Sequence, residues 1–126
     1  MGENSWLDDS TYISFSTLKR TGEWVDTPVW FAPGADCFYI FSAGGAGKVK
    51  RLRNFSACRV APCTFSGTLL DEYRTGSAWL IDDPAGQQFA LQALRRKYGP
   101  QMWAADIGAK LSGRFSRRQY IGFRLD

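Results

Sequence analysis

Short runs of alternating apolar and polar residues, separated by turns that contain glycine or proline, recur along most of the chain. A period of two is typical of β-strands that bury one face. The pattern predicts strands over residues 11–18, 23–31, 37–41, 57–65, 68–81 and 118–125. Pro28 lies inside the second run and cannot donate a ladder hydrogen bond, so it marks either a sheet edge or a place where something other than a strand takes up the backbone hydrogen bonds. Gly76 marks an expected bend in the fifth strand.

Three segments have helical rather than strand spacing. Residues 46–54 place Val49 and Leu52 three apart, and residues 101–112 form a second short candidate helix. The longest candidate begins at Asp83-Pro84, an N-cap followed by proline, and ends at Gly99-Pro100. One face of this longest helix is expected to carry Phe89, Ala90, Ala93, Leu94 and Tyr98. The chain is therefore predicted to be a mostly β domain with two or three helices, its six strands forming an antiparallel barrel or sheet.

A length of 126 residues with 44% hydrophobic content predicts one domain, residues 1–126, with residues 1–10 as an N-terminal surface segment. No apolar run is long enough to span a membrane, and we expect no membrane partner. Cys37, Cys58 and Cys63 include no CxxC pair and are expected to be reduced thiols in a cytoplasmic protein. The net charge of +4 favours anionic partners but falls short of a dedicated nucleic-acid binder.

The chain has no histidine. This excludes Ser-His-Asp and Cys-His catalysis and histidine-ligated metals. The sequence predicts no metal site and identifies no catalytic residue.

The most informative segment is residues 37–54, an apolar strand followed by a glycine turn and a short basic helix. The helix start offers unpaired N–H groups and partial positive charge, which suits a phosphate. A nucleotide P-loop is excluded because Ser42 and Val49 stand where that motif needs glycine and a hydroxyl. The alternative is a solvated basic helix after a flexible turn.

Three segments together resemble the pyridoxamine-phosphate-oxidase-like family: TPVWF (27–31), GKVKRLR (47–53) and RVAPC (59–63). They are most similar to its branch of small proteins that use flavin or the deazaflavin coenzyme F-420, as is LRRKYG (94–99). The resemblance implies a split β-barrel that forms a homodimer, with the cofactor at the subunit interface.

By this resemblance, eight residues are expected to bind the cofactor. One side of the ring would be lined by Thr27, Pro28, Val29 and Trp30 and the other by Ser42 and Ala43, while Lys48, with Lys50, would hold the phosphate. Each has an alternative role. Trp30 is also suited to the core or an interface, Ser42 to satisfying the turn, and Lys50 to solvent. The lysine at 48 gains nothing from the helix dipole, which favours the phosphate role.

The implied function is an oxidoreductase that passes hydride from reduced coenzyme F-420 to a small electron-poor acceptor. The glycine-rich loop lacks the arginine of the vitamin-type oxidases, which favours the F-420 or flavin reductase branch. One alternative is an FMN-binding split-barrel protein with slow or auxiliary redox activity. A second is a cofactor-free module that binds anions or nucleic acid. The cations expected to follow the long anionic tail of F-420 are Lys50, Arg53, Arg114, Arg117 and Arg118.

Overall fold

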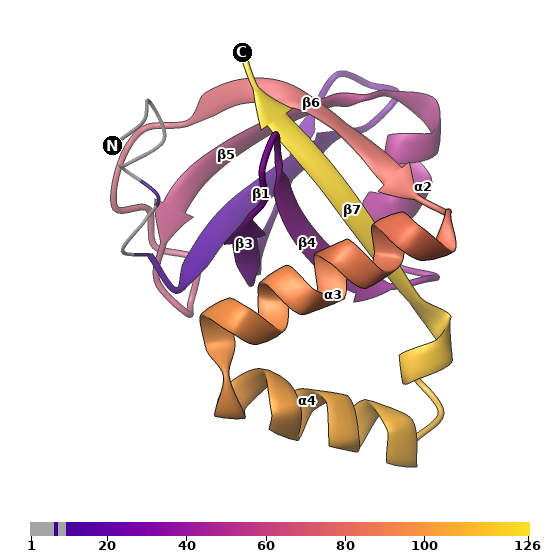
Figure 1. Cartoon of the computed structure of the whole chain (residues 1–126). Coiled ribbons are helices and arrows are strands. Elements are labelled where there is room, and N and C mark those ends of the chain that lie inside the picture. Colours follow the sequence, from indigo (N-terminus) through magenta and orange to yellow (C-terminus); the bar gives the residue numbers. More distant parts are fainter. Residues whose placement is uncertain (1–6, 8–9) are drawn as a thin grey trace.

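Seven antiparallel strands form one sheet in the order β2-β1-β5-β6-β7-β4-β3 (Figure 1). The structure is a computed structural model that describes Leu7 and residues 10–126. The strands are β1 (Tyr12–Leu18), β2 (Trp24–Val29), β3 (Phe31–Pro33), β4 (Phe38–Ala43), β5 (Ala57–Cys63), β6 (Arg74–Ile81) and β7 (Arg118–Leu125). The helices are α2 (Gly47–Asn54), α3 (Pro84–Tyr98), α4 (Pro100–Leu111) and the 3-10 turn η1 (Phe115–Arg117). In Figure 1, α3 lies against the sheet and α4 lies outside α3.

The two edge strands of this sheet are consecutive in the chain. β2 and β3 are separated only by Trp30, so the sheet must curl until its edges meet at that residue. The result is a split barrel, which confirms the predicted mostly β fold class. There are seven described strands rather than six because the predicted strand 23–31 is broken at Trp30. Pro28 lies on the edge strand β2, one of its two expected positions.

Tyr98 explains why the chain breaks at residue 30. Its hydroxyl accepts a hydrogen bond from the Phe31 N–H at 2.9 Å and lies within donating distance of the carbonyl oxygens of Phe31 and Thr11, at 2.9 and 2.8 Å. The Trp30 ring stacks on the Tyr98 ring, with centroids 4.6 Å apart. Burial raises the pKa of Tyr98, so the hydroxyl keeps its proton. A side chain of α3 thus forms hydrogen bonds with the backbone at the point where β2 ends and β3 begins.

Tyr98→Phe is expected to lower the free energy of unfolding by about 1–3 kcal/mol, because it leaves the buried Phe31 N–H without an acceptor. Tyr12→Phe is a matched control, since the Tyr12 hydroxyl forms no hydrogen bond within the described part of the chain. It should change stability by less than about 0.5 kcal/mol. Urea unfolding measures both. A loss for Tyr98→Phe no larger than that for Tyr12→Phe would contradict this role.

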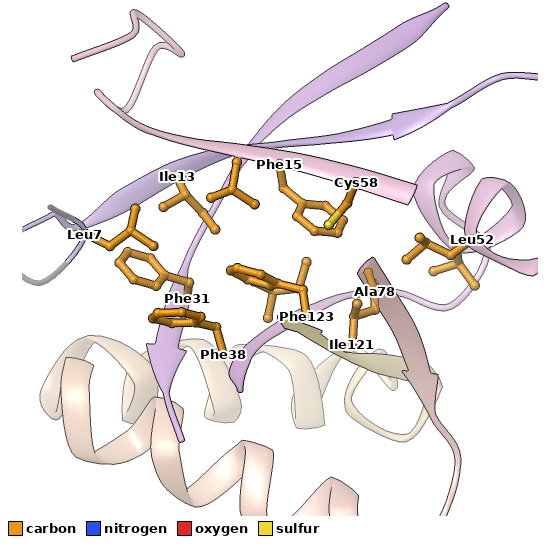
Figure 2. Close-up of a cluster of buried hydrophobic side chains, with 13 residues drawn as sticks. Leu7, Ile13, Phe15, Phe31, Phe38, Leu52, Cys58, Ala78, Ile121 and Phe123 are labelled. Atoms are coloured by element: carbon orange, nitrogen blue, oxygen red, sulfur yellow. The ribbon is translucent and has the colours of Figure 1, made fainter. Parts of the chain in front are cut away.

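Two apolar clusters hold the fold together. The first fills the barrel, where Phe15, Phe38 and Phe123 face one another from three strands (Figure 2). The second lies between the sheet and α3 and includes Leu94 and Tyr98. Strand β4 serves both, because Phe38 and Ile40 face the first cluster while Tyr39 and Phe41 pack on the second. In β4, the alternation of side chains therefore separates two apolar clusters rather than core from solvent.

Several predicted boundaries and orientations were wrong. The predicted strand 68–81 contains a strand only over β6, and Gly76 lies within it, paired with Leu125 of β7. A Cβ at Gly76 would collide with the Arg124 carbonyl, so glycine permits the close pairing with β7. On α3, Phe89 is 63% exposed, and Leu91 is buried instead. The N-terminal segment 1–10 lies mostly outside the described residues, but Leu7 is buried in the barrel core rather than on the surface.

The three cysteines are free, with Cys58 and Cys63 buried and Cys37 partly buried. Burial raises the pKa of Cys58 to about 12. Within the described residues, no cluster of metal-ligating side chains is present. No helix of that part of the chain is long and apolar enough to cross a membrane.

Candidate functional site

The first turn of α2 has unused hydrogen-bond donors. The helix follows β4 through the loop 44–46, and its N-cap, Ala46, offers no side-chain cap. The N–H groups of Val49 and Lys50 donate to the Ala46 carbonyl at 3.1 and 3.3 Å. The N–H groups of Gly47 and Lys48 have no acceptor among the described residues. The first turn contains no acidic residue either. This helix start is therefore open to an anion.

Two cations lie side by side at this helix start. Burial and the nearby Arg51 charge lower the pKa of Lys48 from its usual 10.5. The ion pairs of the described residues use Asp26 and Asp106 as their acids, and neither Lys48 nor Arg51 takes part in one. A half-buried ammonium beside a guanidinium with no compensating carboxylate is unfavourable by itself. A bound anion would relieve both the desolvation and the repulsion.

Arg51 is held in place by β1. Its Nε donates to Oγ1 of the fully buried Thr17 at 2.6 Å. The guanidinium then folds back along α2 toward Gly47, where a Cβ would come within 2.7 Å of Nη1. The glycine at 47 leaves room for Arg51 to reach the helix start. Arg51 was not among the predicted site residues, although its i, i+3 spacing from Lys48 was a usable signal.

The split in the barrel gives the site two strand edges. β3 and β4 pair Phe31 with Ile40, and continuing that register would set Val29 opposite Ser42. Instead, β2 turns away and pairs Val29 with Ile13 of β1. Residues 27–29 and 41–43 are thus left with one unpaired backbone edge each, diverging from Trp30. The chain then passes from Ala43 directly into the loop before α2, so the β4 edge and the helix start belong to one continuous segment.

The eight predicted site residues fall into four groups, of which the last is the lysine pair of α2. Thr27, Pro28 and Val29 lie on the β2 edge, and Ser42 and Ala43 end β4. Ser42 is buried and its Oγ donates to the Ala43 carbonyl at 3.2 Å, so its side chain is already satisfied. Trp30 lies at the point of divergence, where it is partly buried and packs against Tyr98 and Phe41.

Lys48 and Lys50 are not equivalent. Lys48 lies in the first turn beside Arg51, whereas Lys50 is exposed about 200° further round the helix. The structure therefore brings Arg51, rather than Lys50, together with Lys48.

Of the cations expected along an anionic tail, Arg118 is committed elsewhere. Its Nη1 lies 2.7 Å from Oδ1 of Asp106, and the side chain is 7% exposed. Lys50, Arg53, Arg114 and Arg117 are exposed. The Gly44 N–H donates to the Arg117 carbonyl at 2.9 Å, which sets the η1 segment next to the glycine loop.

One cavity borders the predicted residues. It measures about 360 Å³, lies between the end of β4 and α4, and is lined by Ser42, Ala43, Phe41, Gly108 and Arg114 among others. A larger cavity of about 550 Å³ lies between α3 and the β3–β4 hairpin, where it contacts Tyr39 and Arg96 but none of the eight predicted residues. We place the candidate site at α2 and the end of β4, because the unpaired cations and donors are there.

Comparison with known proteins supports the fold at low sequence identity. No family model and no curated protein matches the chain. Among solved structures, a candidate pyridoxamine 5'-phosphate oxidase from Listeria innocua is similar, with a TM-score of 0.66 and 12% identity, over 97% of this chain and 89% of that one. An F-420 reductase aligns at TM-score 0.62 and 16% identity over 100% of this chain and 94% of that one. HutZ, the haem storage protein of Vibrio cholerae, aligns at TM-score 0.70 and 7% identity over 96% of this chain and 85% of that one.

Proposed function

We propose that the chain is a flavin- or deazaflavin-dependent oxidoreductase whose cofactor phosphate binds at the start of α2. The observation that carries the proposal is the pair of cations, Lys48 and Arg51, beside two unused backbone donors and no carboxylate. The fold is shared with a pyridoxamine-phosphate-oxidase-type protein and an F-420 reductase. The haem storage neighbour shows that the fold alone does not choose the cofactor.

The residues present suit each part of such a cofactor. Lys48, Arg51 and the Gly47 and Lys48 N–H groups would hold the phosphate. The unpaired backbone edges at 27–29 and 41–43 would donate to and accept from the polar rim of a flat ring. Once bound, the ring system supplies a carbon or nitrogen centre that gives or accepts hydride. The protein contributes binding and orientation, since the chain has no histidine for acid–base chemistry.

Within this class we propose coenzyme F-420 as the cofactor, with FMN as the alternative, and a small electron-poor organic molecule as the acceptor. The exposed cations favour F-420, because its tail adds several carboxylates beyond the phosphate. Lys50 and Arg53 are exposed on α2, and Arg114 and Arg117 lie at the two ends of the neighbouring η1 turn. These four cations form the proposed binding track for the anionic tail. Arg118 does not belong to it, because it pairs with Asp106.

F-420 is expected to bind more tightly than FMN at low salt, and the difference should shrink as salt rises, because exposed charges are screened. Fluorescence titrations of the purified protein with each cofactor across a salt series measure this. The double variant Lys50→Gln/Arg53→Gln should reduce the difference while leaving FMN affinity nearly unchanged. If FMN binds as tightly as F-420 or more tightly at every salt concentration, FMN is the cofactor and the proposed binding track for the F-420 tail is wrong.

We also propose that the protein is a homodimer with the cofactor at the subunit interface. The segment after β5 supports an interface, because Phe65 is 77% and Leu70 62% exposed, and large apolar side chains gathered on a surface mark contacts. Light scattering at micromolar concentration is expected to give twice the 14.1 kDa chain mass. Phe65→Ser/Leu70→Ser should shift the mass toward the monomer. A monomeric parent protein would exclude a shared cofactor site.

A further inference from the structure

Helix α4 carries an exposed apolar stripe that the proposed redox function does not use. Trp103, Ile107 and Leu111 are 67%, 38% and 85% exposed, and their spacing of four puts them on one face of the helix. The opposite face, with Met102, Asp106 and Ala109, is buried. Figure 1 shows α4 as the outermost element, with α3 between it and the barrel. The stripe therefore faces away from the core.

The segment of the chain that contains the stripe is rich in cations. From the start of α3 to the end of η1, residues 84–117 contain six lysines and arginines and a single acidic residue, an excess of five against +4 for the whole chain. The acidic residue, Asp106, is 4% exposed and neutralised by Arg95 and Arg118. Lys110 and Arg114 are exposed at the C-terminal end of the stripe. The exposed residues of α4 itself include no carboxylate.

We propose that the α4 stripe docks on an anionic lipid bilayer surface. Tryptophan, isoleucine and leucine in line, flanked by lysine and arginine, are the composition of a helix that lies in a membrane interface with its apolar face among the acyl chains. Anionic headgroups complement the cations. This is peripheral binding, and it is compatible with the absence of a spanning helix from the described residues. It revises the sequence-based expectation of no membrane partner.

Charge disfavours two other occupants. A two-fold contact with a second copy sets the same patch against itself, and the exposed residues of α4 offer Lys110 and Arg114 no carboxylate to pair with. A nucleic acid would satisfy the cations, but it leaves Ile107 and Leu111 in water, since phosphates offer them no apolar partner. A bilayer with anionic headgroups satisfies both kinds of side chain at once.

Vesicle flotation tests the proposal with the full-length protein. The protein should float with phosphatidylcholine vesicles that contain phosphatidylglycerol, and only weakly with pure phosphatidylcholine. The triple variant Trp103→Ser/Ile107→Ser/Leu111→Ser should lower the bound fraction at least about tenfold. Because these side chains are exposed, the far-ultraviolet circular dichroism and melting temperature should stay close to those of the parent. Trp103→Phe should retain binding.

Matched controls distinguish binding by the stripe from nonspecific binding by any exposed apolar side chain or any surface cation. The exposed fraction of Phe89 on α3, 63%, is similar to the 67% of Trp103. The Phe89→Ser variant should bind vesicles like the parent protein. Lys110→Gln/Arg114→Gln should weaken binding to the anionic vesicles, whereas Lys19→Gln/Arg20→Gln, at a distant turn, should not. Cofactor titrations of the triple variant should be unchanged, so failure here and failure of the redox proposal are distinguishable.

Three outcomes would overturn the proposal. The first is no flotation with anionic vesicles, or flotation that the triple variant leaves unchanged. The second is that the parent protein binds no vesicles, while light scattering shows a dimeric parent and a monomeric triple variant. That result would assign the stripe to a contact with a second copy of the chain. The third is binding of a single-stranded oligonucleotide that depends on Lys110 and Arg114, with no vesicle binding, which assigns the surface to nucleic acid.

Discussion

Asp106→Ala is expected to lower the free energy of unfolding by about 3–5 kcal/mol, because it removes one partner of a buried ion pair and leaves the other charged. Oδ1 of Asp106 lies 2.7 Å from Arg118 Nη1, and both side chains are almost fully buried. The Arg118 guanidinium lies over the Phe41 and Phe115 rings, 4.4 and 5.0 Å from their centroids, where water has little access. Arg95 binds the second oxygen at 2.8 Å but is 42% exposed, so it can return to solvent.

Urea unfolding of Asp106→Ala, of a control variant and of a double variant with its two single changes checks this account. Asp36→Ala, which removes an exposed carboxylate that forms no ion pair, should change stability by less than about 0.5 kcal/mol. The double variant Asp106→Leu/Arg118→Met should lose less than the sum of the two single changes, because no unpaired buried charge remains. If Asp106→Ala costs no more than Asp36→Ala, the pair does not fix α4 and β7 as the structure indicates.

Lys48→Ala is expected to weaken binding of a phosphate-bearing flavin or deazaflavin by about 1.5–3 kcal/mol, the scale of a charge-assisted hydrogen bond. Folding should not suffer, because burial and Arg51 make the Lys48 ammonium unfavourable in the free protein. Lys50→Ala is the matched control from the same helix and should cost FMN binding much less. Isothermal titration at moderate salt measures the three proteins, and equal affinities would remove α2 from the phosphate site.

The lowered pKa of Lys48 gives this assignment a second readout. In the free protein, Lys48 loses its proton at a pH below the usual 10.5, so its deprotonation contributes stability that appears as pH rises through the lowered pKa. A bound phosphate raises that pKa again. At alkaline pH, where part of the Lys48 population is deprotonated in the free protein, cofactor binding should therefore take up protons. Because the buffer supplies these protons, the measured binding enthalpy should depend on the ionisation enthalpy of the buffer. Lys48→Met should abolish the uptake, and an unchanged uptake would point to another group.

Much of the fold follows from local signals in the sequence. The strand 118–125 and the helix opened by the Asp83 cap lie where periodicity and capping predicted them, since Asp83 accepts from the Gly86 N–H at 2.7 Å. What could not be predicted depends on contacts between distant residues. The break at Trp30 requires Tyr98 of α3, 67 residues after Phe31. The exposure of Phe89 depends on how α3 is rotated over the sheet, and its own spacing leaves that open.

The candidate site divides in the same way. The glycine turn and the helix start with Lys48 were visible in the sequence, because a helix N-terminus is a local feature. The role of Arg51 depends on Thr17, which reaches it from β1. Arg118 looked like a free cation because its partner, Asp106, comes from another element. The unpaired edges of β2 and β4 arise only when β2 pairs with β1 instead of continuing beside β4.

A comparison of FMN with riboflavin tests the central claim most directly, because the two molecules share the ring and differ by the phosphate. Titration of the purified protein, followed by flavin fluorescence, should show FMN binding at least about tenfold more tightly than riboflavin. In Lys48→Ala/Arg51→Gln this preference should nearly disappear. Equal binding of FMN and riboflavin by the parent protein, or a preference that survives the double variant, would contradict a phosphate site at the start of α2.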